Sequence, residues 1–210
     1  MVILFSLFHD IFVNMENLPH SDELMVRRFV EKLAPFSEMD WSEFWSRMEF
    51  AEFKKHQFLL KAGEVENYLN FLVSGIARLY HVIARKEYTI RLIFPGTFFS
   101  SYSSFLNRQP SMYSVEAITD IRLYQMSFEQ LEDLYRVSDV APAIGKRALE
   151  YFYMLKEKRE ISLLSKTAEE NYRDLENEQP ELIQLIPQKY LASYLGITPQ
   201  SLSRIRRYLS

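Results

Sequence analysis

The sequence predicts an α+β chain in which an N-terminal β-roll, a double-stranded β-helix resembling a jelly roll, has flanking helices and precedes a C-terminal helix-turn-helix. Residues 50–126 form short apolar runs of period two between turn residues, as strands of a roll or barrel do. Residues 138–164 carry one long helical pattern. Residues 187–210 contain two helix starts around a turn glycine. The expected domains are 1–28 for an N-terminal extension or helix, 29–136 for the β-roll, 137–165 for the long helix and 166–210 for the helix-turn-helix.

The first residues, MVILFSLFHDIFV, are apolar. This run is too short to span a membrane, which takes about 20 residues, and it lacks the basic start and cleavage site of a signal peptide. One interpretation is an amphipathic helix that lies on the body or on a partner. The other is that translation begins at Met15. In both cases we expect no membrane partner.

Cap residues mark the helices on either side of the roll. Residues 22–48 have helical spacing, but Pro35 interrupts the pattern and Ser37 is a suitable N-cap for a second, short helix. After the roll, Ser127 opens another helix, and Gln130 three residues later completes a capping box. We therefore expect two helices before the roll and one directly after it.

Turn residues divide the predicted roll into strands. Gly63, Gly75 and Gly96 lie at the ends of apolar runs, where a residue that tolerates positive φ is useful. The polar segment IARKEYT lies between two runs and predicts the tip of a hairpin.

The long helix carries an apolar stripe at spacings of three and four residues. Such a stripe is typical of a seam between two helices, so we expect a homodimer along this helix. A single helix packed against its own roll is the alternative. The residues expected at the dimer seam are Val140, Ile144, Ala148, Tyr151 and Leu155.

The segment IPQKYLASYLGITPQSLSRIRRYL reads as two helices joined by a tight turn. Pro187 suits the first turn of a helix, and Gly196 can end it in the left-handed conformation. Thr198 is a natural N-cap with Pro199 at the first helical position. Ala192 is small enough for the helices to cross closely. The inward-facing apolar residues are Leu191, Leu195, Ile197, Leu202 and Ile205.

The outer face of the second helix is polar and basic. Residues 181–210 contain four basic residues and one acid, although the whole chain has a net charge of −3. A locally positive helix-turn-helix is what binding to DNA requires. An αα-hairpin that only closes a helical subdomain is the alternative, because arginines are also common at helix C-termini. The outward-facing side chains are Gln200, Ser201, Ser203, Arg204 and Arg207.

In this order of elements the chain resembles the Crp–Fnr superfamily of bacterial transcription regulators. The resemblance covers nearly all of the chain from residue 29 and includes the motifs KAGE, LVSG, FPG and QKYLASYLGITPQSLSRIRR. It implies a cytoplasmic, homodimeric regulator that binds double-stranded DNA, with RNA polymerase as a further candidate partner. Many members carry a β-hairpin wing after the recognition helix, whereas this sequence stops at Ser210, so we expect no wing.

The resemblance also assigns roles to residues of the last two helices. Thr198 and Ser201 would hold phosphates, and Gln200 and Arg204 would read bases. Pro199 stands where the family often has a basic residue, so the family's half-site preference cannot be transferred. The DNA-binding residues expected in this chain are Gln188 and Lys189, which would anchor the first helix, with Thr198, Gln200, Ser201, Ser203, Arg204 and Arg207.

The resemblance further implies a pocket for a cyclic nucleotide, whose phosphate the family holds with an arginine and whose ribose it holds with a glutamate. Here Thr97 stands where the glutamate is expected and Ser111 where the arginine is expected. Loss of the arginine removes charge-assisted bonds of roughly 1.5–3 kcal/mol each, so we do not expect cyclic AMP. The pocket either takes an unknown small-molecule effector or is vestigial. The candidate effector residues are Thr97, Ser100, Ser103, Arg108, Ser111, Tyr113 and Ser114.

Sensors and enzymes of other kinds would need residues that this sequence lacks or does not group together. There is no cysteine, which excludes an iron–sulfur sensor, and a haem sensor would need His81. A cupin-like enzyme would need clustered metal ligands, but nothing pairs with His81 and Glu87 at the required spacing. We expect no enzyme, no metal and no cofactor. The alternative that stays open is a β-roll sensor or scaffold whose C-terminal helices bind protein rather than DNA.

Overall fold

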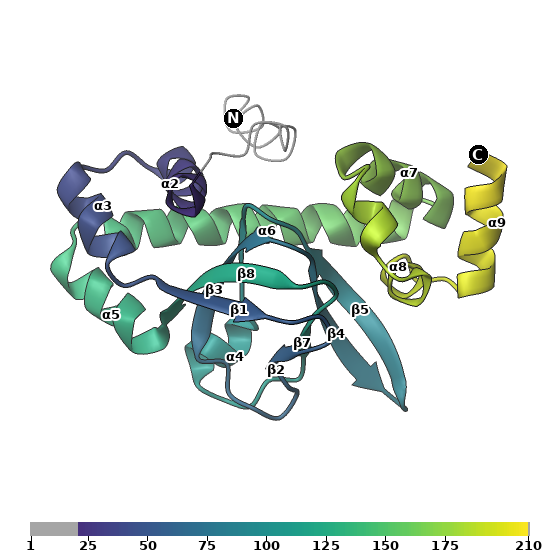
Figure 1. Cartoon of the computed structure of the whole chain (residues 1–210), viewed down its shortest axis with the longest axis horizontal. Coiled ribbons are helices and arrows are strands. Elements are labelled where there is room, and N and C mark those ends of the chain that lie inside the picture. The colour runs from purple at the N-terminus through teal and green to yellow at the C-terminus, as the bar shows by residue number, and fades with distance from the viewer. Residues whose placement is uncertain (1–20, 210) are drawn as a thin grey trace.

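The computed structural model describes residues 21–209. The expectations for residues 1–20, including an N-terminal amphipathic helix or a start at Met15, lie outside this range. The described chain is α+β, as predicted, with a β-roll spanned by a long helix that leads to a C-terminal helical domain (Figure 1).

Two four-stranded antiparallel sheets form the roll. Their strand orders are β1-β8-β3-β6 and β2-β7-β4-β5. Gly75 and Gly96 have φ near 82° in the turns before β4 and β6, which confirms why glycine stands there. The hairpin tip expected in IARKEYT is the β4–β5 turn, where Ala84 and Arg85 also have positive φ. The strands are β1 (Glu49–Phe53), β2 (Phe58–Leu60), β3 (Tyr68–Ser74), β4 (Ala77–Ile83), β5 (Lys86–Ile93), β6 (Thr97–Phe99), β7 (Ser114–Ala117) and β8 (Ile121–Ser127).

The predicted caps set the helix boundaries. Ser37 and Asp40 form a capping box at the start of α3, and Ser127 and Gln130 form one at the start of α5. The expected domain boundary after residue 28 falls inside the continuous helix α2. The helices are α2 (Asp22–Leu33), α3 (Glu38–Trp45), α4 (Tyr102–Asn107), α5 (Phe128–Val137), α6 (Ala141–Ser165), α7 (Ala168–Glu178), the 3-10 helix η2 (Leu182–Leu185), α8 (Gln188–Tyr194) and α9 (Pro199–Leu209).

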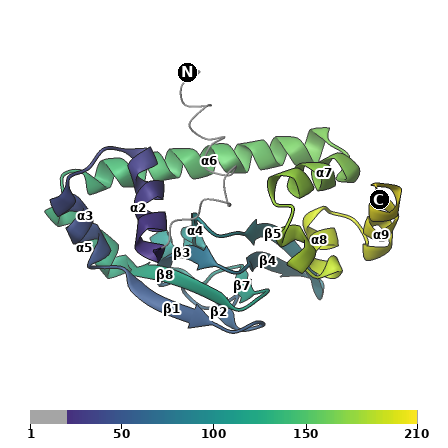
Figure 2. The same ribbon diagram turned by 45° about the horizontal axis from the view of Figure 1, so that its top comes forward.

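The alternation of side chains along the strands divides the core into two layers. Phe71 and Phe98 point out of the roll into a cluster with α2, α3, α5 and α6, whereas their neighbours Leu72 and Phe99 point between the two sheets. Helices therefore cover the outer face of the β1-β8-β3-β6 sheet, as Figures 1 and 2 both show.

Most of the apolar stripe of α6 that we expect at a dimer seam packs in the core of the chain itself. Tyr151 is only 1% exposed and packs against Phe29, so it offers no surface to a partner, and its expected place at the seam is corrected. Ile144 and Leu155 also pack on this cluster. Both faces of α6 are apolar, and spacing alone cannot tell which of them meets the roll. The opposite face exposes Leu149, Tyr153, Leu163 and Leu164.

The C-terminal domain packs on the roll through α8. A shared hydrophobic cluster combines Ile76 and Leu92 of the roll with Leu191 of α8. Ser193 on α8 accepts a hydrogen bond from the Thr89 amide (2.9 Å) and donates one to the Glu87 carbonyl (3.0 Å), both on β5. Because α8 is held by the roll, α9 lies at the far end of the molecule in both ribbon views (Figures 1 and 2).

Candidate nucleic-acid interface and sensor pocket

The helix-turn-helix forms as its sequence predicts. Gly196 has φ of 73°, and the amide of Ile197 donates to the Ala192 carbonyl, which closes the turn. Thr198 caps α9, since its Oγ1 accepts a hydrogen bond from the Ser201 amide at 3.2 Å. The inward positions are buried or packed against the domain core, as predicted, and they are Leu191, Ala192, Leu195, Ile197, Leu202 and Ile205.

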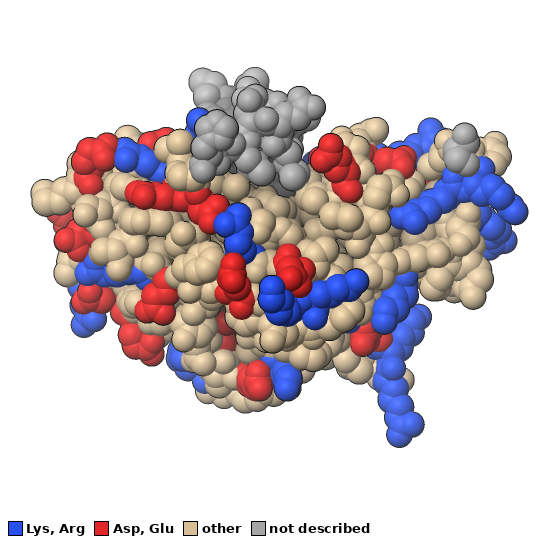
Figure 3. All heavy atoms as spheres, in the orientation of Figure 1, with Lys and Arg blue, Asp and Glu red and all other residues tan. Residues whose placement is uncertain are grey.

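The outer face of α9 is exposed and basic. Gln200, Ser203, Arg204 and Arg207 are exposed on α9, and Lys189 is exposed on α8. Figure 3 shows Lys and Arg side chains gathered at the end of the molecule that α9 occupies. The remaining arginine of the run, Arg206, turns inward instead. Its Nε donates to the Tyr172 hydroxyl at 3.2 Å. Gln200, Ser203, Arg204 and Arg207 thus lie on one exposed face of α9.

Several of the expected contact residues also hold the motif together. The Gln188 amide nitrogen on α8 donates to the Pro199 carbonyl (2.7 Å) and to the Ser203 hydroxyl. Arg204 donates to the Ser201 hydroxyl at 3.2 Å. These bonds cross between α8 and α9 or run along α9, so they orient the recognition surface before any ligand arrives.

A buried arginine that sequence reasoning missed ties α8 to the roll. The side chain of Arg78 on β4 is 2% exposed, and its Nη2 lies 2.6 Å from Glu116 and 2.7 Å from Glu87. Its guanidinium lies 3.6 Å from the ring centroid of Tyr190 on α8 and 4.0 Å from that of Tyr80. Stacking on an aromatic ring suits the flat guanidinium. Arg78 therefore joins two strands of the sheet to the first helix of the helix-turn-helix.

The candidate effector residues do not converge on one point. Ser103 is exposed on α4. Arg108 has a left-handed backbone at the end of α4, and its guanidinium donates to the Glu66 carbonyl (2.7 Å) and the Asn67 side chain (2.6 Å). Ser114 is buried and accepts from the Ala62 amide. Arg108 therefore anchors the loop before β3, and Ser114 anchors the loop after β2.

The hydroxyl of Ser111, the position where the resemblance implies the family's arginine, is paired with another hydroxyl. We expected Thr97 at the glutamate position, but Thr97 contacts Arg91 (3.2 Å). The group that meets Ser111 is the hydroxyl of Ser101, 2.8 Å away, and both serines are buried. The Ser111 hydroxyl also donates to the Tyr113 carbonyl (2.9 Å) and accepts from the Tyr113 amide (3.0 Å). Two neutral hydroxyls thus meet at Ser111, and the sequence carries no signal that Ser101 is the partner.

A buried carboxylate lies beside this pair. Glu66 is 4% exposed and accepts from the amides of Tyr68 (3.1 Å) and Ser101 (3.3 Å). Burial raises the pKa of Glu66 above its ordinary value, although these amides oppose the shift. The Glu66 side chain therefore positions the start of α4.

Residues 21–209 show neither a metal-binding cluster nor a membrane-spanning helix. In that range no group of three or more His, Asp or Glu side chains is arranged to hold a metal ion. None of the helices in the same range combines the length and the apolarity that crossing a bilayer requires.

Comparisons with known proteins agree with this geometry. Residues 50–138 match the family model of the cyclic nucleotide-binding domain. No curated protein matches the chain in sequence.

Solved structures with a similar fold include FixK2, CLP and a catabolite activator protein. FixK2 from Bradyrhizobium japonicum is 18% identical with a TM-score of 0.64, covering 77% of this chain and 84% of that one. The c-di-GMP-responsive regulator CLP of Xanthomonas campestris is 16% identical with a TM-score of 0.64. The match covers 82% of this chain and 91% of CLP. The Thermus thermophilus catabolite activator protein is 21% identical with a TM-score of 0.52, covering 84% and 85%. Residues 50–138 therefore resemble a cyclic nucleotide-binding domain, and the chain shares its fold with FixK2, CLP and the catabolite activator protein.

Proposed function

We propose that the chain is a homodimeric, sequence-specific DNA-binding transcription regulator of the Crp/Fnr type. The observation that carries the proposal is the outer face of α9, which exposes Gln200, Arg204 and Arg207 while Leu202 on its inner face is fully buried. A helix supported in this way can enter a major groove without losing its packing.

The side chains of α9 suit the two parts of DNA recognition. The helix begins at an exposed end, where the amides of the first turn and the helix dipole favour a phosphate. Arg204 lies one turn further along, and arginine can pair with guanine through two hydrogen bonds, whereas Gln200 can pair with adenine. Lys189, exposed on α8, supplies a charge for the backbone.

The exposed face of α6 supports a dimer. Leu149, Tyr153 and Leu164 are large apolar side chains with exposed fractions of 43%, 68% and 90%. They lie within about 60° of one another on the helix, because each residue advances by about 100°. Large apolar side chains exposed on one side of a helix are typical of a protein interface. Two copies joined here would bring two α9 helices to one duplex.

The roll, in this proposal, does not hold a cyclic nucleotide in the family's usual way. Ser101 and Ser111 satisfy each other's hydroxyls, and the nearby Arg108 is committed to Glu66 and Asn67. A cyclic phosphate would therefore meet no guanidinium at this pair. It would also lie near the buried carboxylate of Glu66.

The first test replaces a base-reading side chain. Arg204→Ala should weaken binding to a specific duplex by about 1–3 kcal/mol and relax sequence choice at one position in each half-site. Competition binding against a library of single-base operator variants measures both effects. If Arg204→Ala and the parent had equal affinity and the same sequence profile, Arg204 would not be a base-reading residue.

The second test concerns phosphate contacts. Lys189→Ala should lower the slope of log affinity against log salt by about one, with little change in sequence preference. Lys54→Ala is the matched control, because Lys54 is a similarly exposed lysine on the roll. If the affinity of the parent protein for DNA did not depend on salt, the result would favour the rival function, in which the C-terminal helices bind protein.

A further inference from the structure

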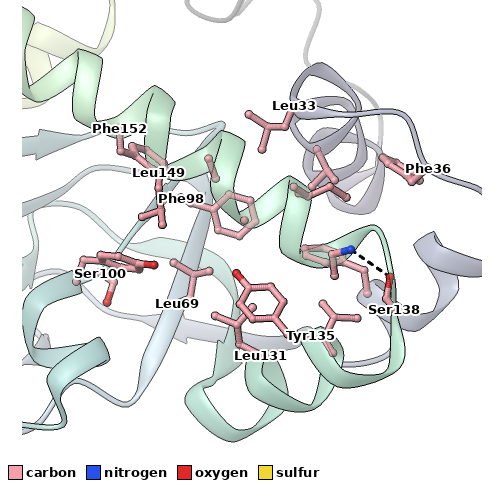
Figure 4. Close-up of a pocket in the computed structure, with 18 of the residues that line it drawn as sticks. Leu33, Phe36, Leu69, Phe98, Ser100, Leu131, Tyr135, Ser138, Leu149 and Phe152 are labelled. Atoms are coloured by element: carbon pink, nitrogen blue, oxygen red, sulfur yellow. Dashed lines mark hydrogen bonds between the residues drawn. The ribbon is translucent and has the colours of Figure 1, made fainter.

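An apolar cavity of about 190 Å³ lies between the roll and the helices that cover it. The strands β3 and β6 form one wall, and α2, α3, α5 and α6 form the others. Leu69, Phe98, Leu131 and Tyr135 surround it (Figure 4). Neither Ser101 nor Ser111 is among the lining residues. The cavity is therefore separate from the Ser101–Ser111 hydroxyl pair.

Among the described residues, the one cation in the wall of this cavity, Arg91, forms no ion pair with a carboxylate. The guanidinium of Arg91 donates to the Thr97 hydroxyl (3.2 Å) and lies 5.4 Å from the ring centroid of Phe152. Among residues 21–209, no carboxylate lies within 4 Å of it. Burial without a counter-charge lowers the pKa of Arg91. Arg91 is only partly exposed, and a guanidinium in such a site gains from a charge-assisted bond to an anion.

The polar groups of the lining are segregated. Ser100 also lines the cavity, and its hydroxyl is buried without a hydrogen-bond partner among the described residues. Asp40 is the other charged lining residue. Its carboxylate accepts hydrogen bonds from the Ser37 amide and hydroxyl and from the Ser138 hydroxyl. Figure 4 shows Ser138 on one side of the cavity and Ser100 and Phe152 on the other. The carboxylate of Asp40 is thus held near Ser138, away from the Ser100 end.

We propose that this cavity binds a small monocarboxylate with a compact apolar body, whose carboxylate pairs with Arg91 and accepts a hydrogen bond from Ser100. The apolar body would lie against Leu69, Phe98 and Tyr135. A cavity of about 150 Å³ lined by apolar side chains is enough to hold benzene. The volume here therefore suits an acid of the size of benzoate or octanoate. The proposal is independent of DNA binding.

The test compares acids with neutral analogues of the same shape. Benzoate and octanoate should raise the unfolding temperature of the full chain and bind in calorimetric titrations, because a ligand that prefers the folded state stabilises it. Benzyl alcohol and octanol should bind at least tenfold more weakly, since they cannot form charge-assisted bonds to Arg91. Equal affinities for acids and alcohols, or no binding of either, would overturn the proposal.

Variants locate the site. Arg91→Gln should weaken octanoate binding about 10- to 100-fold and leave octanol binding unchanged, whereas Lys54→Gln should change neither. Leu69→Trp fills the cavity and should abolish binding of both. Octanoate binding that survives in folded Arg91→Gln and Leu69→Trp proteins would place the ligand elsewhere and contradict the proposal. Should these variants not fold, the comparison of acids with alcohols on the parent protein decides alone.

Discussion

A protein carrying Tyr153→Glu and Leu164→Glu together should be monomeric and should bind a twofold-symmetric duplex about 10²- to 10⁴-fold more weakly than the parent. Both side chains lie on the exposed face of α6, with 68% and 90% of their surface accessible. Glutamates opposite one another across a seam would be desolvated and repel each other. Loss of the second DNA-binding module removes the gain that comes from binding two half-sites at once.

Sedimentation velocity measures the first effect and titration of a labelled duplex measures the second. Arg147→Glu is the matched control, because Arg147 is exposed on α6 but lies about 160° around the helix from Leu149. It should leave both the dimer and the DNA affinity intact. A double variant that is still dimeric would show that the interface does not lie on this face of α6.

Arg78→Met should lower the free energy of unfolding by about 3–5 kcal/mol, the largest loss we expect from a single charged residue in this chain. Removal of the arginine leaves Glu116 buried, with His56 at 3.3 Å as its remaining partner, and removes the guanidinium on which Tyr190 stacks. Taking one partner from a buried ion pair leaves an uncompensated charge in a low-dielectric site, which is strongly destabilising. Urea denaturation followed by far-UV circular dichroism measures the change.

Two further variants separate the ion pair from simple loss of packing. Arg122→Met serves as the control, because Arg122 is half exposed and its contact with Asp22 is 3.4 Å. It should change stability by less than about 1 kcal/mol. Adding Glu116→Leu to Arg78→Met should recover much of the loss, since no unpaired charge then stays buried. If Arg78→Met were no more destabilising than Arg122→Met, the proposed role of Arg78 in holding α8 on the roll would fail.

The features that the sequence predicts best are those fixed by residues close together in the chain. The capping boxes at Ser37 and Ser127, the turn at Gly196 and the N-cap at Thr198 are local features, and each is confirmed. The alternation along the strands likewise predicted a roll, because a strand that separates two apolar layers must alternate its side chains. The resemblance to the Crp–Fnr superfamily is confirmed at the level of the fold and of the domain in residues 50–138.

The features that sequence reasoning missed depend on distant partners. Arg78 lies within an apolar run, and nothing nearby indicates that it will meet Glu116 and Tyr190. The face of α6 that packs on the roll was misassigned for Tyr151, because both faces are apolar and only the packed structure distinguishes them. Ser101 was passed over because a serine in a loop carries no signal until its partner Ser111 is placed beside it.

The most direct measurement of the central claim is selection of bound fragments from genomic DNA by the purified full-length chain. A dimer that presents two α9 helices to one duplex predicts an enriched motif with twofold symmetry and half-site centres about 34–36 Å apart, one helical turn or a multiple of it. The same selection with Arg204→Ala should lose information at one position of each half-site. No enriched motif, or a motif without symmetry, would contradict the account.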